Sequence, residues 1–576
     1  MNHAKPSLAW CLGLIFAAAS AGAQQPASEA ADLILEHGAI RVDGGWVEAL
    51  AIRQGVIIAV GDQASVRVHR GAATRIVDLA GATVVPGLHD MHVHPISAGL
   101  QQTECRFAQG TAGAQVLAAV KACVATRSRG EWVTGGQWDA ASFGPQGMQL
   151  RQLDAVSPDN PVVLTDISYH SVWANSQALR LARIDRRTTN PPGGVIERDA
   201  RGEPTGVLRE SAAGLVRALL PLPTAAQNQQ ALRWSMDAML RQGITSFTDA
   251  LVDEEGLRAY AALADAGQLH QRVRACQIWR QSPRPVADSA AGFAVQRNLW
   301  ARPRFQPDCV KIALDGVPTD SHTGAMLEPY VDTDGHGDER ARGMLMVPAE
   351  NLGAAVSAFD AAGLVVKMHA AGDGAVRAGL DAIAATRAAN GDSGLRHDIA
   401  HNSFADQADL RRAKGLSATL EMSPYIWFPN PIIPDVVKAV GPERMLRWTP
   451  VRDAIDAGAL VVPGSDWSVV PSVNPWLALE TLVTRQRPGG GGEVLGASQR
   501  ISLEQAFDLF TVNAARQMGN QGRTGRIARG MLADLLVLDR NPFRIPVTEV
   551  HLTQVRAVVI EGVLVRGELK GVGSQD

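Results

Sequence analysis

The middle of the chain alternates short apolar runs with helical stretches, and no other feature of the sequence limits the fold as strongly. Stretches such as residues 349–363 have the length and composition of a helix, and they lie between apolar runs that are typical of buried strands. Repeated strand and helix units of this kind form a parallel sheet. Eight strands are predicted, at residues 83–94, 243–250, 272–278, 309–316, 364–370, 397–403, 415–422 and 460–466. The predicted fold class is therefore α/β, with a (β/α)8 TIM-type barrel.

The two ends of the chain have a different pattern from the middle. Short apolar runs separated by turn residues fill both ends, which is typical of an all-strand structure. We expect residues 30–85 and 526–570 to form one small β-sandwich domain, beside a barrel domain at residues 86–525. The interval between the first two barrel strands is too long for one helix, so an inserted subdomain is expected at about residues 96–235.

The start of the chain has the organisation of a cleaved export signal. Lys5 precedes an apolar stretch at residues 8–19, and the small residues at 21–23 form a cleavage site. A membrane anchor is the alternative, but the stretch is shorter than the ~20 apolar residues that span a bilayer. We therefore expect a periplasmic or secreted protein, with a signal peptide at residues 1–23 and no membrane association after cleavage.

Export would place the cysteines in an oxidising compartment, where disulfides form. Cys105 and Cys123 both lie in the expected insertion, and we predict a disulfide between them. Cys276 and Cys309 lie in apolar, strand-like runs, where a free buried thiol is the more common state, so we expect both to be free. The sequence has no CxxC pattern, which excludes a zinc ribbon.

Charge and composition exclude some classes of partner. The formal net charge is -3 and the chain has no long run of like charge, so nothing favours a nucleic-acid partner. Apolar residues make up 46% of the chain and charged residues 20%, which is typical of a globular protein. We expect a small-molecule substrate as the partner, and assembly into a homo-oligomer stays open.

Residue types that bind metals end several of the predicted strands. The C-terminal ends of barrel strands form the active-site face. His92 and His94 are two residues apart on the first strand and face one side, whereas His89 faces the other side and is expected outside the site. The seventh strand offers no such residue. We predict that a metal site is formed by His92, His94, Lys311, His369, His401 and Asp466.

Five motifs carry a resemblance to a known family. They are "PGLHDMHVHP", "VKIALDG", "KMHAAGDGAV", "IAHNS" and "GSDWSV", in this order. The chain resembles the metal-dependent amidohydrolase superfamily, specifically the amidohydrolase-3 group with its YtcJ-like and N-substituted formamide deformylase-like enzymes. The resemblance covers nearly the whole chain after the leader. It implies one or two divalent ions, usually zinc, although manganese, iron and nickel stay open, and the residues that bind them are His92, His94, His369, His401 and Asp466.

The resemblance also implies a role for Lys311. Many members of the family carry at this place a lysine that CO2 has carboxylated, and such an N6-carboxylysine bridges two metal ions. An unmodified lysine does not ligate a metal ion, so the carbamate is what would make this residue type useful there. The alternative is an unmodified Lys311 that pairs with Asp315 or with another acid.

The chemistry expected of this site is hydrolysis by a metal-activated hydroxide. A bound metal ion brings the pKa of water to about 7 and polarises a carbonyl group. Asp466 is expected to take the proton of the water as general base and to pass it to the leaving nitrogen as general acid. His170 and His322 are further catalytic candidates. Trp138 and Trp467 are candidates for substrate binding, and a core or surface role is the alternative for each of these four residues.

The function expected from these observations is that of an exported metal-dependent amidohydrolase that cleaves the C–N bond of an amide, N-formyl or cyclic amide group. A lactone, ester or phosphoester hydrolase on the same metal site is the second hypothesis, because an activated hydroxide attacks all of these bonds. A non-catalytic binding protein on a barrel of this type is the third. The presence of every expected ligand from His92 to Asp466 favours a catalyst.

Overall fold

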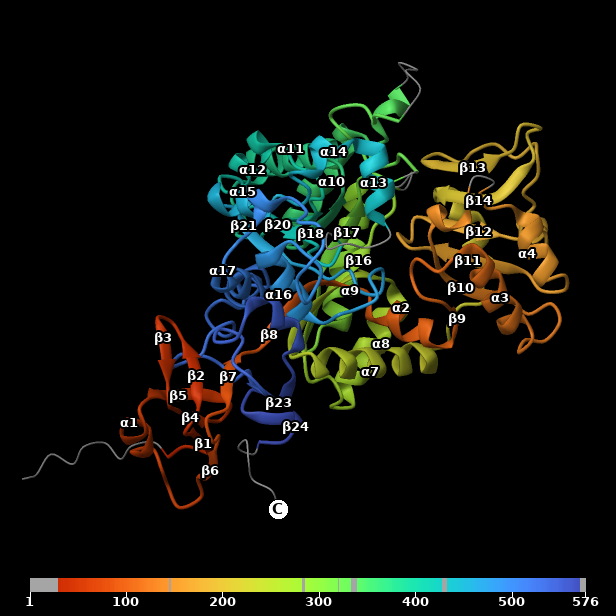
Figure 1. Ribbon diagram of the computed structural model, residues 1–576. Coiled ribbons are helices and arrows are strands. Elements are labelled where there is room, and N and C mark those ends of the chain that lie inside the picture. The colour runs from red at the N-terminus through yellow and green to blue at the C-terminus, as the bar shows by residue number, and fades with distance from the viewer. Residues whose placement is uncertain are drawn as a thin grey trace, which may run out of the picture.

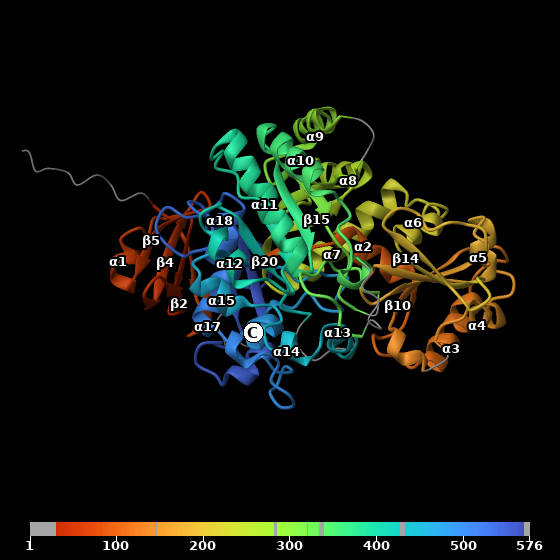
Figure 2. The same cartoon turned by 90° about the horizontal axis from the view of Figure 1, so that it is seen from above.

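The computed structural model describes residues 30–144, 147–281, 285–319, 321–332, 339–426 and 432–569. The signal peptide predicted at residues 1–23 lies outside the described residues. Within the described ranges, no helix has both the length and the apolar character that crossing a bilayer requires. Figures 1 and 2 show a central barrel, with an inserted unit on one side of it and a region of short strands on the other.

The barrel is a sheet of eight parallel strands that follow one another in sequence order. Each strand overlaps one of the predicted strands, so the α/β class with a TIM-type barrel is confirmed. A parallel bridge between Val93 and Trp467 joins the end of the last strand to the first strand. The strands are β8 (Leu88–Val93), β15 (Ile244–Val252), β16 (Arg272–Ile278), β17 (Phe305–Ala313), β18 (Val365–Ala370), β19 (Asp398–His401), β20 (Thr419–Met422) and β21 (Leu460–Pro463).

Helices cover the outside of the barrel (Figure 2). The helix α7 (Ala225–Arg241) shows how local sequence sets a boundary, because Thr224 and Gln227 form a reciprocal capping box at its start. One face of α7 packs its apolar side chains into the barrel core. The other helices of the barrel region are α2 (Pro95–Leu100), α8 (Glu254–Asp265), α9 (Val286–Trp300), α10 (Ala349–Ala361), α11 (Asp373–Asn390), α12 (Gln407–Ala413), α13 (Ile432–Val440), α14 (Pro442–Met445), α15 (Val451–Asp456), α16 (Pro475–Thr484), α17 (Leu503–Asp508) and α18 (Ala514–Gln517).

The inserted unit is a six-stranded sheet with helices on both faces. Neighbouring residues of a strand face opposite sides, and so Leu164 joins the core under α3 and α4 while Val163 joins the core under α5 and α6. The elements are β9 (Cys105–Arg106), α3 (Gly113–Val124), β10 (Val133–Trp138), α4 (Leu150–Val156), β11 (Val162–Asp166), β12 (Ser171–Ala174), α5 (Ser176–Leu181), β13 (Gly194–Arg198), β14 (Pro204–Glu210) and α6 (Ser211–Arg217).

The third region joins the two ends of the chain. The N-terminal strand β7 pairs antiparallel with the C-terminal strand β22, with Val85 opposite Leu536. Two sheets, of four and six strands, enclose a shared apolar core. Their elements are β1 (Leu33–Glu36), β2 (Ala39–Val42), β3 (Gly45–Val47), β4 (Ala49–Arg53), β5 (Val56–Gly61), α1 (Gln63–Arg67), β6 (Arg75–Asp78), β7 (Thr83–Pro86), β22 (Leu535–Leu538), β23 (Val555–Ile560) and β24 (Val563–Gly567).

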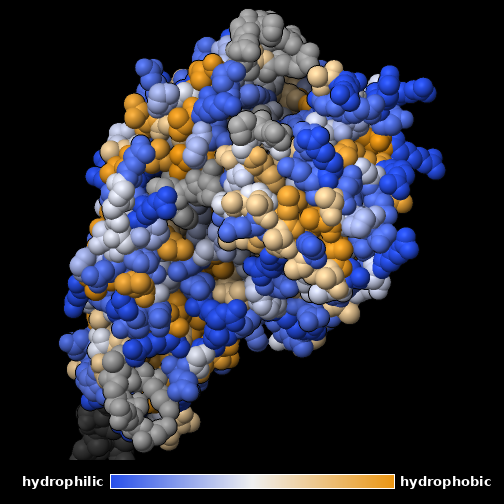
Figure 3. All heavy atoms as spheres, turned by 45° about the vertical axis from the view of Figure 1, so that its right-hand side comes forward, coloured by the Kyte–Doolittle hydropathy of each residue, from blue (hydrophilic) through white to orange (hydrophobic). Residues whose placement is uncertain are grey.

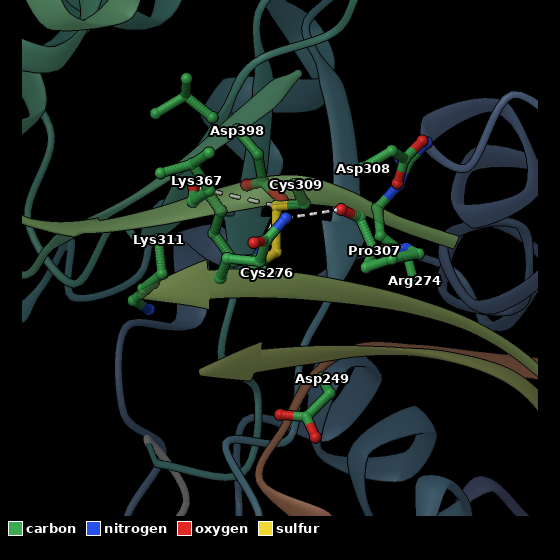
Figure 4. Close-up of a disulfide and its surroundings, with 12 residues drawn as sticks. Asp249, Arg274, Cys276, Pro307, Asp308, Cys309, Lys311, Lys367 and Asp398 are labelled. Carbon is green, nitrogen blue, oxygen red and sulfur yellow. Dashed lines mark hydrogen bonds and ion pairs between the residues drawn. A yellow bond between two sulfur atoms is a disulfide. The ribbon is translucent and has the colours of Figure 1, made fainter. Parts of the chain in front are cut away.

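Two disulfides are present among the described residues. Cys105 of β9 is bonded to Cys123 of α3, within the inserted unit. Cys276 of β16 is bonded to Cys309 of β17, so the expectation that these two thiols are free is wrong. The reason is the register of the barrel, which places the two residues directly opposite each other on adjacent parallel strands. Figure 4 shows this bond between the two strands.

Candidate active site

The predicted metal ligands lie close together at the C-terminal ends of the barrel strands. The ring centroid of His92 is 5.3 Å from that of His94 and 4.7 Å from that of His401. The rings of His401 and His369 are 4.5 Å apart. One carboxylate oxygen of Asp466 lies 3.1 Å from Nε2 of His94 and 3.5 Å from Nε2 of His92. The four imidazoles and the carboxylate therefore form one cluster.

Lys311 reaches this cluster from β17. Its Nζ lies 3.3 Å from Nε2 of His92, and the side chain is buried. Burial and the nearby charge of Lys367 lower the pKa of Lys311 to about 8. Asp315, the alternative partner from the sequence, instead accepts three backbone N–H groups at 2.8 to 3.0 Å. Lys311 forms no ion pair with an acid in the described part of the chain.

Three of the histidines are kept uncharged by their surroundings. Burial lowers the pKa values of His92, His369 and His401 well below the ordinary 6.5, and the charge of Lys311 acts in the same direction on all three. A neutral imidazole has a lone pair for a metal ion, which an imidazolium lacks. The donor atoms of His92, His94 and Asp466 lie within 4.8 Å of one another, a spacing that fits one divalent ion.

Glu421, on the seventh strand, was missed by the sequence reasoning, which expected no site residue there. Its Oε2 lies 2.6 Å from Nδ1 of His92, and its Oε1 accepts a hydrogen bond of 3.1 Å from Ser423 Oγ. Ser423 Oγ in turn lies 3.0 Å from Nδ1 of His401. One carboxylate therefore orients two imidazoles of the cluster, directly and through a hydroxyl group. A single acid inside an apolar strand was the available signal.

The charge of Glu421 has a buried partner. Lys367 Nζ lies 3.6 Å from Glu421 Oε2 and 2.6 Å from Asp398 Oδ2. Figure 4 shows Lys367 and Asp398 joined on neighbouring strands near Lys311. A buried ammonium group between two carboxylates compensates part of the desolvation cost of all three.

His170 comes from the inserted unit rather than from the barrel. Its ring lies 5.1 Å from that of His369, and its Nδ1 lies 2.8 Å from Oε2 of Glu210. Thr323 donates a hydrogen bond of 2.5 Å to the other oxygen of Glu210. Burial opposes a charge on His170, but the charge and hydrogen bond of Glu210 outweigh it and raise the pKa of His170 to about 9. His170 therefore carries a proton at neutral pH.

Three sequence candidates lie elsewhere. His322 faces Asp332, with 2.8 Å between Nε2 and Oδ1, and is absent from the described lining of the cavity beside the histidines. Trp138 is buried in the core of the inserted unit, and its indole N–H donates to the carbonyl of Leu164. Both side chains are therefore occupied by structural contacts instead of facing the cluster. Trp467 lines a neighbouring groove.

Backbone geometry at the first and last strands explains how the ligands converge. Asp90 accepts hydrogen bonds from the backbone N–H groups of His92, at 3.1 Å, and Ser465, at 2.9 Å. Asp466 adopts a left-handed conformation with φ 60°, which turns the chain sharply after β21. Gly464 allows the close approach, because a Cβ there would lie 2.4 Å from Glu421 Oε1.

A cavity adjoins the cluster. His170, His369, His401 and Asp466 form its polar side. The rest of the wall is mainly apolar and comes from the inserted unit, from α13 and from loops of the barrel. It includes Ile167, Val317, Ile432, Val436, Trp448 and Val470, together with the polar residues Gln109, Ser168, Thr319 and Ser403. The cavity has a volume of about 70 Å³. The arrangement presents acid, base and metal-binding groups to one apolar chamber.

Comparisons with known proteins find relatives of this chain over nearly its whole length. Two curated relatives are each 29% identical to the chain: YtcJ of Bacillus subtilis, over 91% of this chain and 96% of its own, and the N-substituted formamide deformylase of Arthrobacter pascens, over 90% and 94%. A solved structure, an uncharacterized metal-dependent hydrolase from Pyrococcus furiosus, shares the fold with a TM-score of 0.67 and 23% identity, over 89% of this chain and 100% of that chain.

The family assignment rests on a match over most of the chain. The amidohydrolase family profile, of the amidohydrolase-3 group, matches residues 75–566. This range includes all eight barrel strands and the whole cluster from His92 to Asp466. The resemblance that the five motifs carried is thus confirmed, and the chain belongs to the amidohydrolase family.

Proposed function

We propose that this protein is an exported, metal-dependent hydrolase that cleaves the C–N bond of an amide, N-formyl or cyclic amide group. One observation carries the proposal: neutral imidazoles, a carboxylate and a lysine of lowered pKa form one buried cluster, and three of its members, His369, His401 and Asp466, also line an apolar cavity. The amide class is supported by the family and by the relative that is named as an N-substituted formamide deformylase.

The proposed metal site consists of the six clustered residues. His92, His94, His369, His401, Asp466 and Lys311 would hold one or two divalent ions, and imidazole and carboxylate ligands suit zinc. When bound, such an ion supplies Lewis acidity, which makes water more acidic and polarises a carbonyl group. The residues of the chain must then orient the substrate and move protons.

Lys311 is proposed to be an N6-carboxylysine. The lowered pKa supports this, because only the uncharged amine reacts with CO2 and a larger fraction is uncharged at neutral pH. The carbamate would give this residue an anionic oxygen beside His92. Protein equilibrated with carbon-13-labelled CO2 should show a carbamate signal by NMR, and Lys311→Arg should lack it. A wild-type spectrum without that signal would leave Lys311 as a plain lysine.

Asp466 is proposed as the general base and acid. Its carboxylate faces His92 and His94 and also lines the cavity, so it touches both the metal-binding cluster and the space for substrate. It can accept a proton from water and return it to the leaving nitrogen, which leaves as a neutral amine.

His170 is proposed to bind the substrate oxygen. Glu210 holds Nδ1 of the protonated ring, and the second N–H remains available on the side that lines the cavity. A cationic donor stabilises the negative charge that develops on a carbonyl oxygen during attack.

The decisive experiment is a hydrolysis screen of N-acyl, N-formyl and cyclic amides with zinc-loaded protein, with chelator-treated protein as control. Turnover that requires metal supports the proposal. Matched esters and lactones in the same screen test the second hypothesis, which a strong preference for the ester would support. Protein that binds no metal and gains no activity from added zinc or manganese would be a binding protein instead.

Export is a separate part of the proposal. The organisation of residues 1–23 supports it, and so do two disulfides, which persist in oxidising compartments. Protein recovered from the periplasm or medium should begin after residue 23 by N-terminal sequencing. Accumulation of the uncleaved chain in the cytoplasm with free thiols would contradict export.

A further inference from the structure

A second depression lies beside the cavity, and we name it the outer groove. It runs between α2 and α7 of the barrel, the first segment of the inserted unit and the loop at residues 467–474. Its volume is about 820 Å³, whereas the cavity at the histidines has about 70 Å³. Gln109 and Val470 line both spaces, so the two are neighbours with a shared wall.

We propose that the outer groove is a second substrate subsite, which binds the amine part of an amide when that part carries an aromatic ring. This inference rests on the proposed function of the metal site. The substrate class it names is an amide with a small acyl group and a large aromatic amine.

The difference in size sets which part of the substrate goes where. The cavity beside His170 and His401 has less than a tenth of the volume of the outer groove. A large substituent must therefore extend beyond it, and the adjoining space is the groove.

The positions of Asp466 and the residue that follows it set the orientation of the substrate amide. Asp466 lines the cavity, and the next residue, Trp467, lines the groove. Asp466 returns its proton to the leaving nitrogen in the proposed reaction, so that nitrogen must lie on the Asp466 side. The amine substituent then points toward Trp467, and the acyl group faces the apolar chamber.

The walls of the groove suit a flat polar ring. Trp234 of α7 stacks on Trp467, with ring centroids 5.9 Å apart and an interplanar angle of 25°, and 39% of Trp234 is exposed. Amide side chains form much of the remaining lining, at Gln101, Gln102, Gln109, Gln137, Gln242 and Asn474. Indole faces stack with aromatic rings, and amides form hydrogen bonds to polar substituents. Four of these amides already donate an N–H group within the protein, at Gln101, Gln102, Gln109 and Gln137.

The cationic groups of the groove already have partners. Arg241 pairs with Asp237, and Arg106 donates a hydrogen bond of 2.6 Å to Gln102. Gln102 is a neutral partner, so Arg106 keeps its positive charge, and the outer groove accepts a ring with a polar or an anionic substituent. Figure 3 shows hydrophobic and hydrophilic residues intermixed over one face of the molecule.

Glutamine side chains also hold the loop between the two spaces. Gln109 Nε2 donates to the carbonyl of Val469 at 3.1 Å, and Gln137 Nε2 donates to the carbonyl of Ser468 at 2.9 Å. These bonds attach the loop to the inserted unit. The boundary between cavity and groove is thereby kept in place by residues of both regions.

Three amides test the proposal with zinc-loaded protein. N-acetyltyramine has a small acyl group and an aromatic amine, N-methylacetamide is small on both sides, and N-methyl-3-phenylpropanamide carries its ring on the acyl side. We expect the highest kcat/KM for N-acetyltyramine. Trp234→Ala should raise its KM by about 3- to 10-fold with kcat unchanged, as for loss of one aromatic stack, and should leave N-methylacetamide unaffected. Trp300→Ala, on the outer helix α9, is the matched control.

A binding measurement keeps this test separate from hydrolysis. Titration of chelator-treated protein with N-acetyltyramine, followed by tryptophan fluorescence, should show saturable binding that Trp234→Ala weakens and Trp300→Ala retains. If no amide is hydrolysed but this difference in binding is found, the metal-site proposal fails and the groove proposal stands. Equal KM and equal binding in wild type and Trp234→Ala would overturn the groove proposal, as would a preference for N-methyl-3-phenylpropanamide.

Discussion

The barrel contributes three buried histidines to the site and the inserted unit contributes one beside them, but the two regions hold their imidazoles in opposite charge states. His92, His369 and His401 of the barrel are buried beside Lys311 and are neutral. His170 of the inserted unit is buried as well, yet its bond to Glu210 keeps it protonated.

The comparison teaches that the neighbours of a histidine decide its chemistry. The three barrel histidines have lone pairs for a metal ion, whereas His170 has N–H groups for a substrate oxygen. Burial alone would make all four neutral. The carboxylate of Glu210, on β14, is what keeps His170 protonated and so distinguishes it from the three neutral histidines.

The largest loss of activity is expected from a substitution among the barrel histidines. His92→Ala removes a ligand that contacts Asp466, Lys311 and Glu421, so metal and turnover should be lost together. Metal content by elemental analysis and turnover on the same preparation measure this. A metal-replete, active His92→Ala protein would remove His92 from the site.

Asp466→Asn separates metal binding from proton transfer. The amide keeps an oxygen near His94 but is no base at neutral pH. Metal should persist while turnover falls by roughly 100- to 10,000-fold, the usual contribution of a positioned general base. Full activity with full metal content would leave Asp466 a structural residue, as a helix cap would be.

Glu421→Gln tests the hydrogen bonds that orient His92 and His401. Loss of the carboxylate that orients His92 and His401 should weaken metal affinity by about 10- to 100-fold. Competition with a chelating dye measures affinity without any turnover. Glu480→Gln is the matched control, because Glu480 is also buried and lies 2.6 Å from Nδ1 of His551, a histidine that is not part of the cluster. Equal affinities of the two variants would contradict the role of Glu421.

Glu210→Gln tests the inserted unit. The pKa of His170 lies above its ordinary value of 6.5. The ion pair with Glu210 therefore stabilises the folded protein in full below pH 6.5, and this contribution is lost as the pH rises through about 9. Turnover of the wild type should fall above about pH 9 for the same reason. In the Glu210→Gln variant the fall in turnover should begin at a lower pH, toward 6.5, so that turnover at about pH 7.5 is roughly 10-fold lower than in the wild type. Glu197→Gln, on β13, should keep the wild-type profile.

The elements predictable from the sequence are those with local signals. Each barrel strand is a short buried run, and the candidate ligands from His92 to Asp466 mark the strand ends, where barrels place their chemistry. The resemblance of the motifs supplied the family. Both kinds of signal need only a few neighbouring residues.

The features that were missed depend on contacts between distant segments. Glu421 acts on His92 across the barrel, and Cys276 meets Cys309 only because β16 and β17 adopt one register. Trp138 was a candidate for substrate binding, but its side chain lies in the apolar core between the sheet of the inserted unit and its helices. Which face of a strand is inside, and which residue lies opposite, is settled by packing that the sequence does not spell out.

The pairing of β7 with β22 has a consequence for the order of events in biosynthesis. Val85 leaves the ribosome long before its partner Leu536 is made, so the N-terminal sheet stays open at that edge until synthesis is nearly complete. Such distant pairings close slowly, and an unpaired edge invites association with other chains. With this topology, the N-terminal sheet can complete its folding only after the C-terminal strands have been synthesised, whatever the local propensity of its first strands.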